Sequence, residues 1–294
     1  MFPVELLNSE ANAANLLEQV RWRDSLYCPH CRSESVIKHD SYRQYQRYLC
    51  TDCDRTFNPK TATIFAHAKI GLDKLLFAFY TLLRFNTSIR QLDAELDVSY
   101  RSLRRRVEQF ARTLDAPAID LVGPVEIDEV YVTAGLKGCE RDQESRSRGL
   151  SKRGRGSYAE DKPSVFTLVD RGTDQRYVVP AKSADESTVR LLLGDREEES
   201  LTVYTDGFRA YDPLEDDENF QREAVIHGEG EYVDEDAHVN TCESHASLTR
   251  RWLSPHRGVS KDKLTPYLRA FQLRREVSRK PGKEALKTIL ETAL

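Results

Sequence analysis

Apolar residues recur at helical spacing between residues 69 and 116. In the first stretch, 69–85, leucines and phenylalanines lie three or four positions apart, which predicts a helix of about 15 residues. Two amphipathic stretches follow at 88–97 and 100–114, joined by a tight Val98-Ser99 connection. Ser99 can cap the second of these helices, since a serine oxygen accepts from free N–H groups at a helix start. The pattern predicts a helix-turn-helix region over 69–116.

After Gly123 the apolar period becomes that of strands. Strands are expected at 125–132, 163–169, 177–180, 201–205 and 224–226, and helices at 185–193 and after His238. The first three strands are interpreted as antiparallel neighbours. The polar residues 135–162 between the first two strands read as a loop, because glycine, serine and arginine dominate them. The fold class predicted is α/β, of the mixed α+β kind.

The first 60 residues divide into two smaller parts. Residues 1–22 have helical spacing, and Asn8 or Ser9 can interrupt or cap it. Residues 23–60 hold short strand-like pieces and are too small to own a core. From its length, a chain of 294 residues is expected to hold one large domain and something smaller, as a two-part or three-part protein.

Four of the six cysteines form two CxxC pairs, Cys28 with Cys31 and Cys50 with Cys53, and 18 residues separate the pairs. This spacing is typical of a tetrahedral zinc site with four thiolates. Such a site leaves no open position, so the zinc would be structural and would supply folding energy to residues 23–60. Two disulfides or a redox dithiol are the alternatives. His30 is expected to lie outside the ligand set.

Charge is distributed unevenly along the chain. The net charge is −4, but residues 121–243 hold 15 basic and 29 acidic residues, whereas residues 244–294 hold 12 and 4. An acidic block followed by a basic tail is expected where metal ions and DNA meet, and a solvated acidic surface is the alternative. No apolar run reaches the roughly 18 residues of a membrane span, and the N-terminus lacks the basic character of a signal peptide. A cytoplasmic protein without a membrane partner is expected.

Four arginines of the 100–114 helix lie away from its apolar stripe: Arg101, Arg104, Arg105 and Arg112. Guanidinium groups suit contacts with phosphates and guanine edges. If the helix-turn-helix is a DNA-binding motif, this second helix would enter the major groove. The alternative is an ordinary solvated helix face.

Two aspartates are candidates for a divalent metal site. Asp128 lies within the strand-like VEIDEVYV, and Asp206 ends the strand-like run LTVYTD. If these strands are neighbours, the two carboxylates can meet and bind Mg²⁺ or Mn²⁺, which prefer oxygen ligands. The alternatives are a solvent-facing side of the strand that Asp128 shares with Glu126, and a plain turn at Asp206-Gly207.

A third segment, HVNTCESHASLTRRW, supports the metal site. Asn240, Glu243, Ser247 and Arg250 recur three or four positions apart, so they would line one face of a helix. That face presents an amide, a carboxylate and a cation together. A capped, solvated helix face is the alternative.

These segments resemble insertion-sequence transposases of the DDE class, in the branch that joins an N-terminal zinc ribbon to an ISXO2-like transposase domain. The resemblance rests on CPHC with CTDC, VEIDEVYV, VYTDGFRAY and the segment from His238 to Arg275, and spans roughly residues 20–275. It implies an RNase H-like catalytic core over 122–280 with Asp128, Asp206 and Glu243 as metal ligands. Some members of this branch have asparagine as the third residue, so Asn240 stands beside Glu243 as a candidate.

The resemblance also implies the activity. A transposase would hold the terminal inverted repeats of its element, cut them with metal ions and join them to target DNA, acting as a homo-oligomer on the DNA. Basic residues at the end of the third segment and after it would contact phosphates, among them Arg250, Arg251, Lys261, Lys263 and Arg274. Two rivals remain: a zinc-ribbon DNA-binding regulator with an inactive transposase-derived core, and a structure-specific nuclease of the same fold.

Overall fold

The computed structural model describes residues 3–115, 118–135, 155–159, 161–194, 200–225, 238–256 and 258–294. The chain forms two compact units, one of residues 1–115 with 273–294 and one of residues 116–272. Helix α8 (Lys261–Arg279) begins in the second unit and ends in the first. The second unit ends at Gln272, and the bounds 122–280 expected for the catalytic domain stay a prediction.

The first unit is mainly helical. Its helices are α1 (Val4–Leu7), α2 (Glu10–Arg21), α3 (Leu72–Phe85), α4 (Ile89–Glu95), α5 (Tyr100–Thr113) and α9 (Gly282–Thr292). Ser9 caps α2, because its hydroxyl accepts from the N–H of Asn12 at 3.2 Å. Helix α2 therefore begins directly after one of the two capping residues that the sequence suggested.

Helices α3, α4 and α5 form where the three apolar stripes predicted helices, and they pack on one another. Phe79 of α3 stacks on Phe110 of α5 with ring centroids 4.7 Å apart. α3 ends at Phe85, and the next residue, Asn86, takes the left-handed conformation that often closes a helix. α4 begins with a capping box between Ser88 and Gln91. Ser99 occupies the N-cap position of α5 without a side-chain hydrogen bond.

A three-stranded antiparallel sheet follows α2: β1 (Val36–Tyr42), β2 (Tyr45–Cys50) and β3 (Thr56–Phe57). Its buried cluster is small, with Tyr48 and Phe57 stacked beside Trp22. Almost all of β1 is exposed. The sheet also contacts α2, since the hydroxyl of Tyr45 donates to Glu10 at 2.7 Å.

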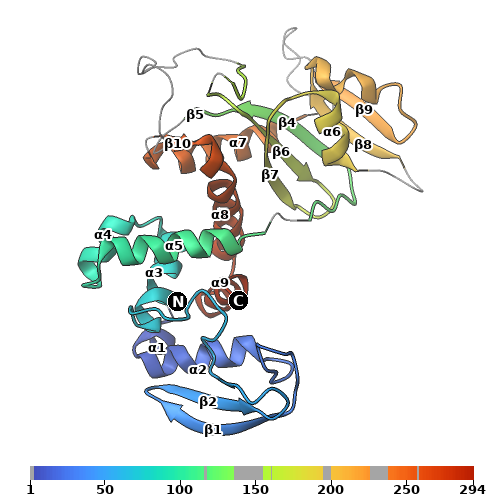
Figure 1. Cartoon of the computed structure of the whole chain (residues 1–294). Coiled ribbons are helices and arrows are strands. Elements are labelled where there is room, and N and C mark those ends of the chain that lie inside the picture. Colours follow the sequence, from blue (N-terminus) through green and yellow to red (C-terminus); the bar gives the residue numbers. More distant parts are fainter. Residues whose placement is uncertain are drawn as a thin grey trace. The chain divides into compact units, whose positions relative to one another are not determined.

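The second unit is built on a five-stranded mixed sheet of order β7-β6-β4-β8-β9 (Figure 1). The strands are β4 (Val125–Tyr131), β6 (Ser164–Asp170), β7 (Arg176–Ala181), β8 (Leu201–Asp206) and β9 (Phe220–Val225). β4, β6 and β7 are antiparallel neighbours, as expected, while β4, β8 and β9 run parallel. The fifth strand begins earlier than the predicted 224–226. β4 is the central strand of the sheet, and this explains why apolar residues occur on both of its faces.

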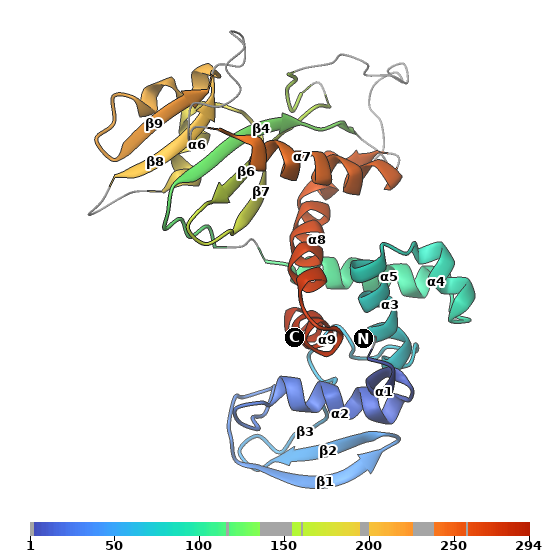
Figure 2. The same ribbon diagram turned by 180° about the vertical axis from the view of Figure 1, so that it is seen from behind.

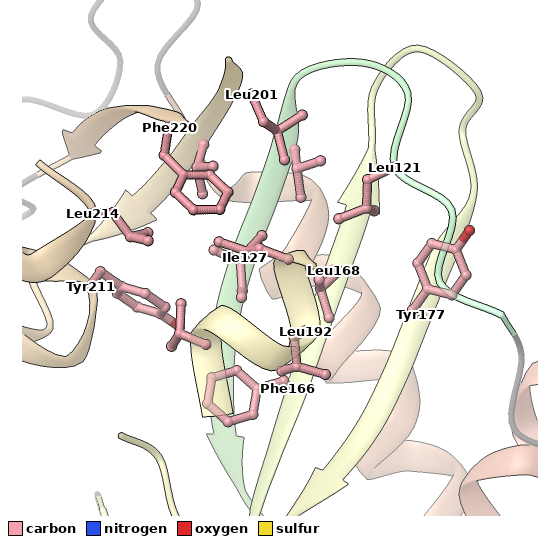
Figure 3. Packing of buried hydrophobic residues seen from close by; sticks show 14 residues of the cluster. Leu121, Ile127, Phe166, Leu168, Tyr177, Leu192, Leu201, Tyr211, Leu214 and Phe220 are labelled. Atoms are coloured by element: carbon pink, nitrogen blue, oxygen red, sulfur yellow. The ribbon is translucent and has the colours of Figure 1, made fainter. Parts of the chain in front are cut away.

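Each face of the sheet has its own core. On one face, Ile127 and Val125 pack with α6 (Glu186–Leu193) and with the 3-10 helix η1 (Arg209–Leu214), which contributes the fully buried Tyr211 (Figure 3). On the other face, Val130 packs against α7 (Asn240–Leu253) and the beginning of α8. Figure 2 shows α7 lying across β4 and β6. The sheet is therefore covered on both sides.

A short parallel pair links α7 and α8 to the segment after β4. β10 (Val259–Ser260) pairs with β5 (Ala134–Gly135), and the short 3-10 helix η3 (Ser254–His256) precedes it. The loop expected at 135–162 falls largely outside the described residues. Within the described ranges, no helix is both long and apolar enough to cross a membrane.

Candidate active site and metal centres

Strand register brings Asp128 and Asp206 together. β4 and β8 are parallel neighbours in which Val125 pairs with Val203 and Glu126 with Tyr204. Asp128 and Asp206 each come two residues later on their strands, so both point to the same side of the sheet at the same level. Asp206 also forms the turn that was the alternative to a metal-binding role, because its Oδ1 accepts from the N–H of Phe208 at 2.9 Å. The turn therefore orients the carboxylate of Asp206 and is compatible with a role of this carboxylate in metal binding.

A third carboxylate completes this group, which we call the acidic cluster: Asp128, Glu129 and Asp206. Ligand oxygens of the three residues all lie within 4.8 Å of one another. Three carboxylates at such distances repel one another and each can ligate a hard cation. The donor set therefore fits Mg²⁺ or Mn²⁺.

The sequence analysis did not select Glu129. It lies beside Asp128, is 8% exposed, and its Oε2 accepts from the hydroxyl of Tyr211 at 3.0 Å. The guanidinium of Arg155 lies 3.5 Å from its Oε1. Little in the sequence pointed to Glu129, because residues on both faces of this strand are buried.

Electrostatics of the cluster favour a bound cation. Burial, followed by repulsion from Asp206 and Glu243, raises the pKa of Asp128 to about 7, although Arg250 acts in the opposite direction. Burial and repulsion from Asp206 raise the pKa of Glu129 to about 7 as well. The alternative of a solvent-facing side shared by Asp128 and Glu126 is wrong, because Glu126 is fully buried under α7.

The raised pKa values give a testable pH dependence. The ordinary pKa values are 3.8 for Asp128 and 4.5 for Glu129, so between about pH 4 and pH 7 the folded protein holds protons that the unfolded chain has lost. Stability should therefore fall as pH rises through this window, by up to about 1.4 kcal/mol per pH unit for each group. We expect metal-free protein to be more stable at pH 5.5 than at pH 7.5, and Mg²⁺ to restore stability at pH 7.5.

The measurement is urea unfolding at both pH values, with and without Mg²⁺. Other carboxyls also titrate, so the Asp128→Asn variant serves as the reference. Its stability should change less between the two pH values than that of the wild type. An equal change of stability in the wild type and in Asp128→Asn would contradict a raised pKa of Asp128.

Helix α7 presents the predicted third segment beside the cluster. Asn240, Glu243, Ser247 and Arg250 are exposed on one face, as expected, while the opposite face buries Cys242, His245, Ala246 and Thr249. Glu243 and Arg250 both act electrostatically on Asp128. Glu243 lies outside the group whose oxygens fall within 4.8 Å. A bound cation would have to draw Glu243 closer or use it through water.

The four predicted zinc ligands also meet. Cys28, Cys31, Cys50 and Cys53 offer sulfur atoms that all lie within 4.8 Å of one another. The Sγ atoms of Cys28 and Cys53 are 3.7 Å apart, and those of Cys31 and Cys50 are 3.6 Å apart. These separations suit four thiolates around one ion with Zn–S distances of about 2.3 Å. His30 is exposed, and its backbone N–H points to Cys28 Sγ at 3.4 Å.

The predicted DNA-binding residues differ in their surroundings. Arg101, Arg104 and Arg105 of α5 are exposed, and Arg104 pairs with Glu108 at 3.0 Å. Arg250, Arg251 and Lys263 are also exposed.

Two basic residues of the tail make contacts inside the protein. Lys261 is 12% exposed, pairs with Asp161 at 2.8 Å and donates to the carbonyl of Tyr158 at 2.7 Å. Arg274 donates to the carbonyl of Leu83 at 2.6 Å. These contacts give both cations a structural role.

Two family descriptions match the chain. Residues 120–276 match the ISXO2-like transposase domain, and residues 8–56 match the transposase zinc-ribbon domain. A relative from Halobacterium salinarum, described as an uncharacterized protein in transposable element ISH50, is 71% identical over 294 residues, which cover all of both chains.

Solved structures give a weaker comparison. The crystal structure of a pre-cleavage Mos1 transpososome is 14% identical and covers 68% of this chain and 75% of its own, with a TM-score of 0.24. The Mos1 strand transfer complex is also 14% identical, with a TM-score of 0.24 over 71% of this chain and 77% of its own. Because these scores are low, no argument rests on them.

Proposed function

Because the chain belongs to the family of transposases with an ISXO2-like transposase domain and a transposase zinc-ribbon domain, we propose that it catalyses metal-dependent DNA cleavage and strand transfer. Its substrates would be the terminal inverted repeats of an insertion sequence and the target DNA. The observation that carries the proposal is the meeting of Asp128 and Asp206 from two parallel strands.

The acidic cluster supports this chemistry. Asp128 and Asp206 would ligate the catalytic Mg²⁺ or Mn²⁺, and Glu129 is a further ligand candidate because its oxygen lies in the same group. Divalent cations bound there would supply activation of the attacking oxygen and stabilisation of the leaving oxygen. Arg155 and the exposed Arg250 place positive charge beside the cluster, where a DNA phosphate could be held.

The remaining parts would bind and position DNA. The four-cysteine cluster within 23–60 would hold a structural zinc, and residues 69–116 would act as a helix-turn-helix with Arg101, Arg104 and Arg105 toward DNA. The mixed sheet, with three antiparallel strands followed by two parallel ones, supports an RNase H-like core for the region 122–280. Cleavage at two element ends favours a homo-oligomer on the DNA.

The experiment uses a linear DNA that carries the element's own ends, with Mg²⁺ and a target plasmid. Cleaved ends and joined product are both expected. Cleavage without joining would favour a nuclease of the same fold. Specific binding of the ends without cleavage would favour a regulator with an inactive core.

The third ligand can be identified by separate substitutions in α7. We expect Glu243→Ala to reduce cleavage by about 100-fold or more and Asn240→Ala to reduce it less, because an amide contributes no charge to the site. Ser244→Ala is the matched control, since Ser244 is exposed on the same helix. Full activity in both the Glu243 and the Asn240 variant would place the third ligand elsewhere, and the measurement is the initial rate of end cleavage.

A further inference from the structure

Glu126 is a buried carboxylate that lies between the acidic cluster and helix α7. It is 0% exposed and sits two residues before Asp128 on the same side of β4. A buried carboxylate costs free energy unless hydrogen bonds and opposite charge compensate it. Its contacts therefore indicate what the residue does.

The first of these contacts cap helix α7. The Oε2 atom of Glu126 accepts from the backbone N–H groups of Thr241 at 2.9 Å and Cys242 at 3.1 Å. These N–H groups belong to the first turn of α7, where no intrahelical acceptor exists. The N-cap residue, Val239, has no side chain that could accept. A carboxylate of β4 thus replaces the missing local cap and also meets the positive end of the helix dipole.

Two further residues hold Glu126 in place. The Nε of Arg171 donates to Oε1 at 3.0 Å, and the same guanidinium donates to the carbonyl of His238 at 2.8 Å. The guanidinium also lies 4.0 Å from the ring centroid of Tyr204 on β8. Arg171 therefore joins Glu126, the residue before the α7 N-cap, and the strand that carries Asp206.

A second set of contacts holds the first turn of α7 in place. The thiol of Cys242, which is fully buried, lies 3.2 Å from the carbonyl oxygen of Glu126 and 3.3 Å from that of Thr167. The first turn of α7 is thereby fixed to both β4 and β6. Asn240 and Glu243 belong to this turn, so their distance from Asp128 depends on these contacts.

We propose that Glu126 is a positioning residue for the catalytic metal site, which holds the first turn of α7 so that Glu243 and Asn240 stand opposite Asp128. The inference rests on the proposed function, since it assumes that the acidic cluster binds divalent metal. Residues behind metal ligands commonly change metal affinity by 10–100-fold when replaced. Glu126 acts through the helix and does not touch the metal.

The test uses electron paramagnetic resonance to measure the binding of Mn²⁺ to the full chain without DNA. Glu126→Gln keeps the shape but places an amide N–H₂ against N–H donors from α7 or Arg171. We expect its Mn²⁺ dissociation constant to rise by roughly 10–100-fold. Hydrogen exchange of the peptide that contains Thr241 and Cys242 should also accelerate. Arg171→Lys is a milder change and should weaken Mn²⁺ binding less than Glu126→Gln. If Glu126→Gln does not fold, Arg171→Lys provides the test.

Asp170→Asn is the matched control. Asp170 is also 0% exposed and accepts from backbone N–H groups, those of Val122, Gly123, Gly172 and Thr173, at the opposite end of the sheet from the acidic cluster. It should lower stability and leave Mn²⁺ affinity unchanged. Equal loss of Mn²⁺ affinity in the Asp170 and Glu126 variants, or unchanged affinity in Glu126→Gln, overturns the inference. A wild type that binds no Mn²⁺ overturns the proposed function instead.

Discussion

Asp128→Asn is expected to reduce Mg²⁺-dependent cleavage of the element ends by about 1,000-fold or more. The substitution removes one of the two carboxylates that the parallel register of β4 and β8 brings together. An amide can ligate weakly but carries no charge, so both metal affinity and stabilisation of the leaving oxygen suffer. Asp206→Asn should have an effect of the same size, because the two residues lie at the same level of the sheet.

The same substitution should not destabilise the metal-free protein at neutral pH. Burial and neighbouring acids raise the pKa of Asp128 to about 7, so removing its charge relieves repulsion within the cluster. Loss of activity together with equal or greater stability is the expected combination, and thermal unfolding beside the cleavage assay measures it. Binding of the element ends without metal should be unchanged.

Asp216→Asn is the control for this experiment. Asp216 is exposed and belongs to the acidic run 215–218, so its loss changes net charge by the same amount without touching the cluster. Its cleavage rate should equal that of the wild type. Retention of Mg²⁺-dependent cleavage in Asp128→Asn or Asp206→Asn would rule out the proposed site.

Local patterns predicted the elements of the fold well. The apolar stripes of α3 and α5, the cap at Ser9 and the end of α3 before Asn86 all appear in the structure. Each depends on residues within a few positions, which a sequence displays directly. The start of β9 was missed, because Phe220 and Gln221 become a strand through pairing with Leu201 and Thr202, and such pairing is not local.

The site was predictable only in part, because it also depends on strand pairing, which is not local. Asp128 and Asp206 lie together because β4 and β8 are neighbours. The sequence was compatible with this strand order but did not determine it. In VEIDEVYV both sides of the strand are buried, so alternation did not reveal that Glu126 faces α7 and Glu129 faces Tyr211. The role of Lys261 was equally hidden, since its partner Asp161 lies 100 positions away.

Removal of zinc is expected to unfold the cysteine-bearing sheet while the rest of the chain stays folded. The hydrophobic cluster there is small, and almost all of β1 is exposed, so the sheet lacks the burial to stand alone. Structural zinc contributes about 10–16 kcal/mol in comparable small sites. Cys50→Ser, or treatment with a strong chelator, should abolish hydrogen-exchange protection in β1 and β2 and release one zinc per chain.

The control for the zinc experiment is His30→Ala. His30 lies within the first CxxC pair and is exposed, so its loss should leave both the zinc content and the protection of β2 unchanged. Protection of α6 and β4 should persist in every variant, because their core is separate. If β2 keeps its protection after zinc is removed, then contacts with α2, such as the bond from Tyr45 to Glu10, hold the sheet, and zinc is not the source of its stability.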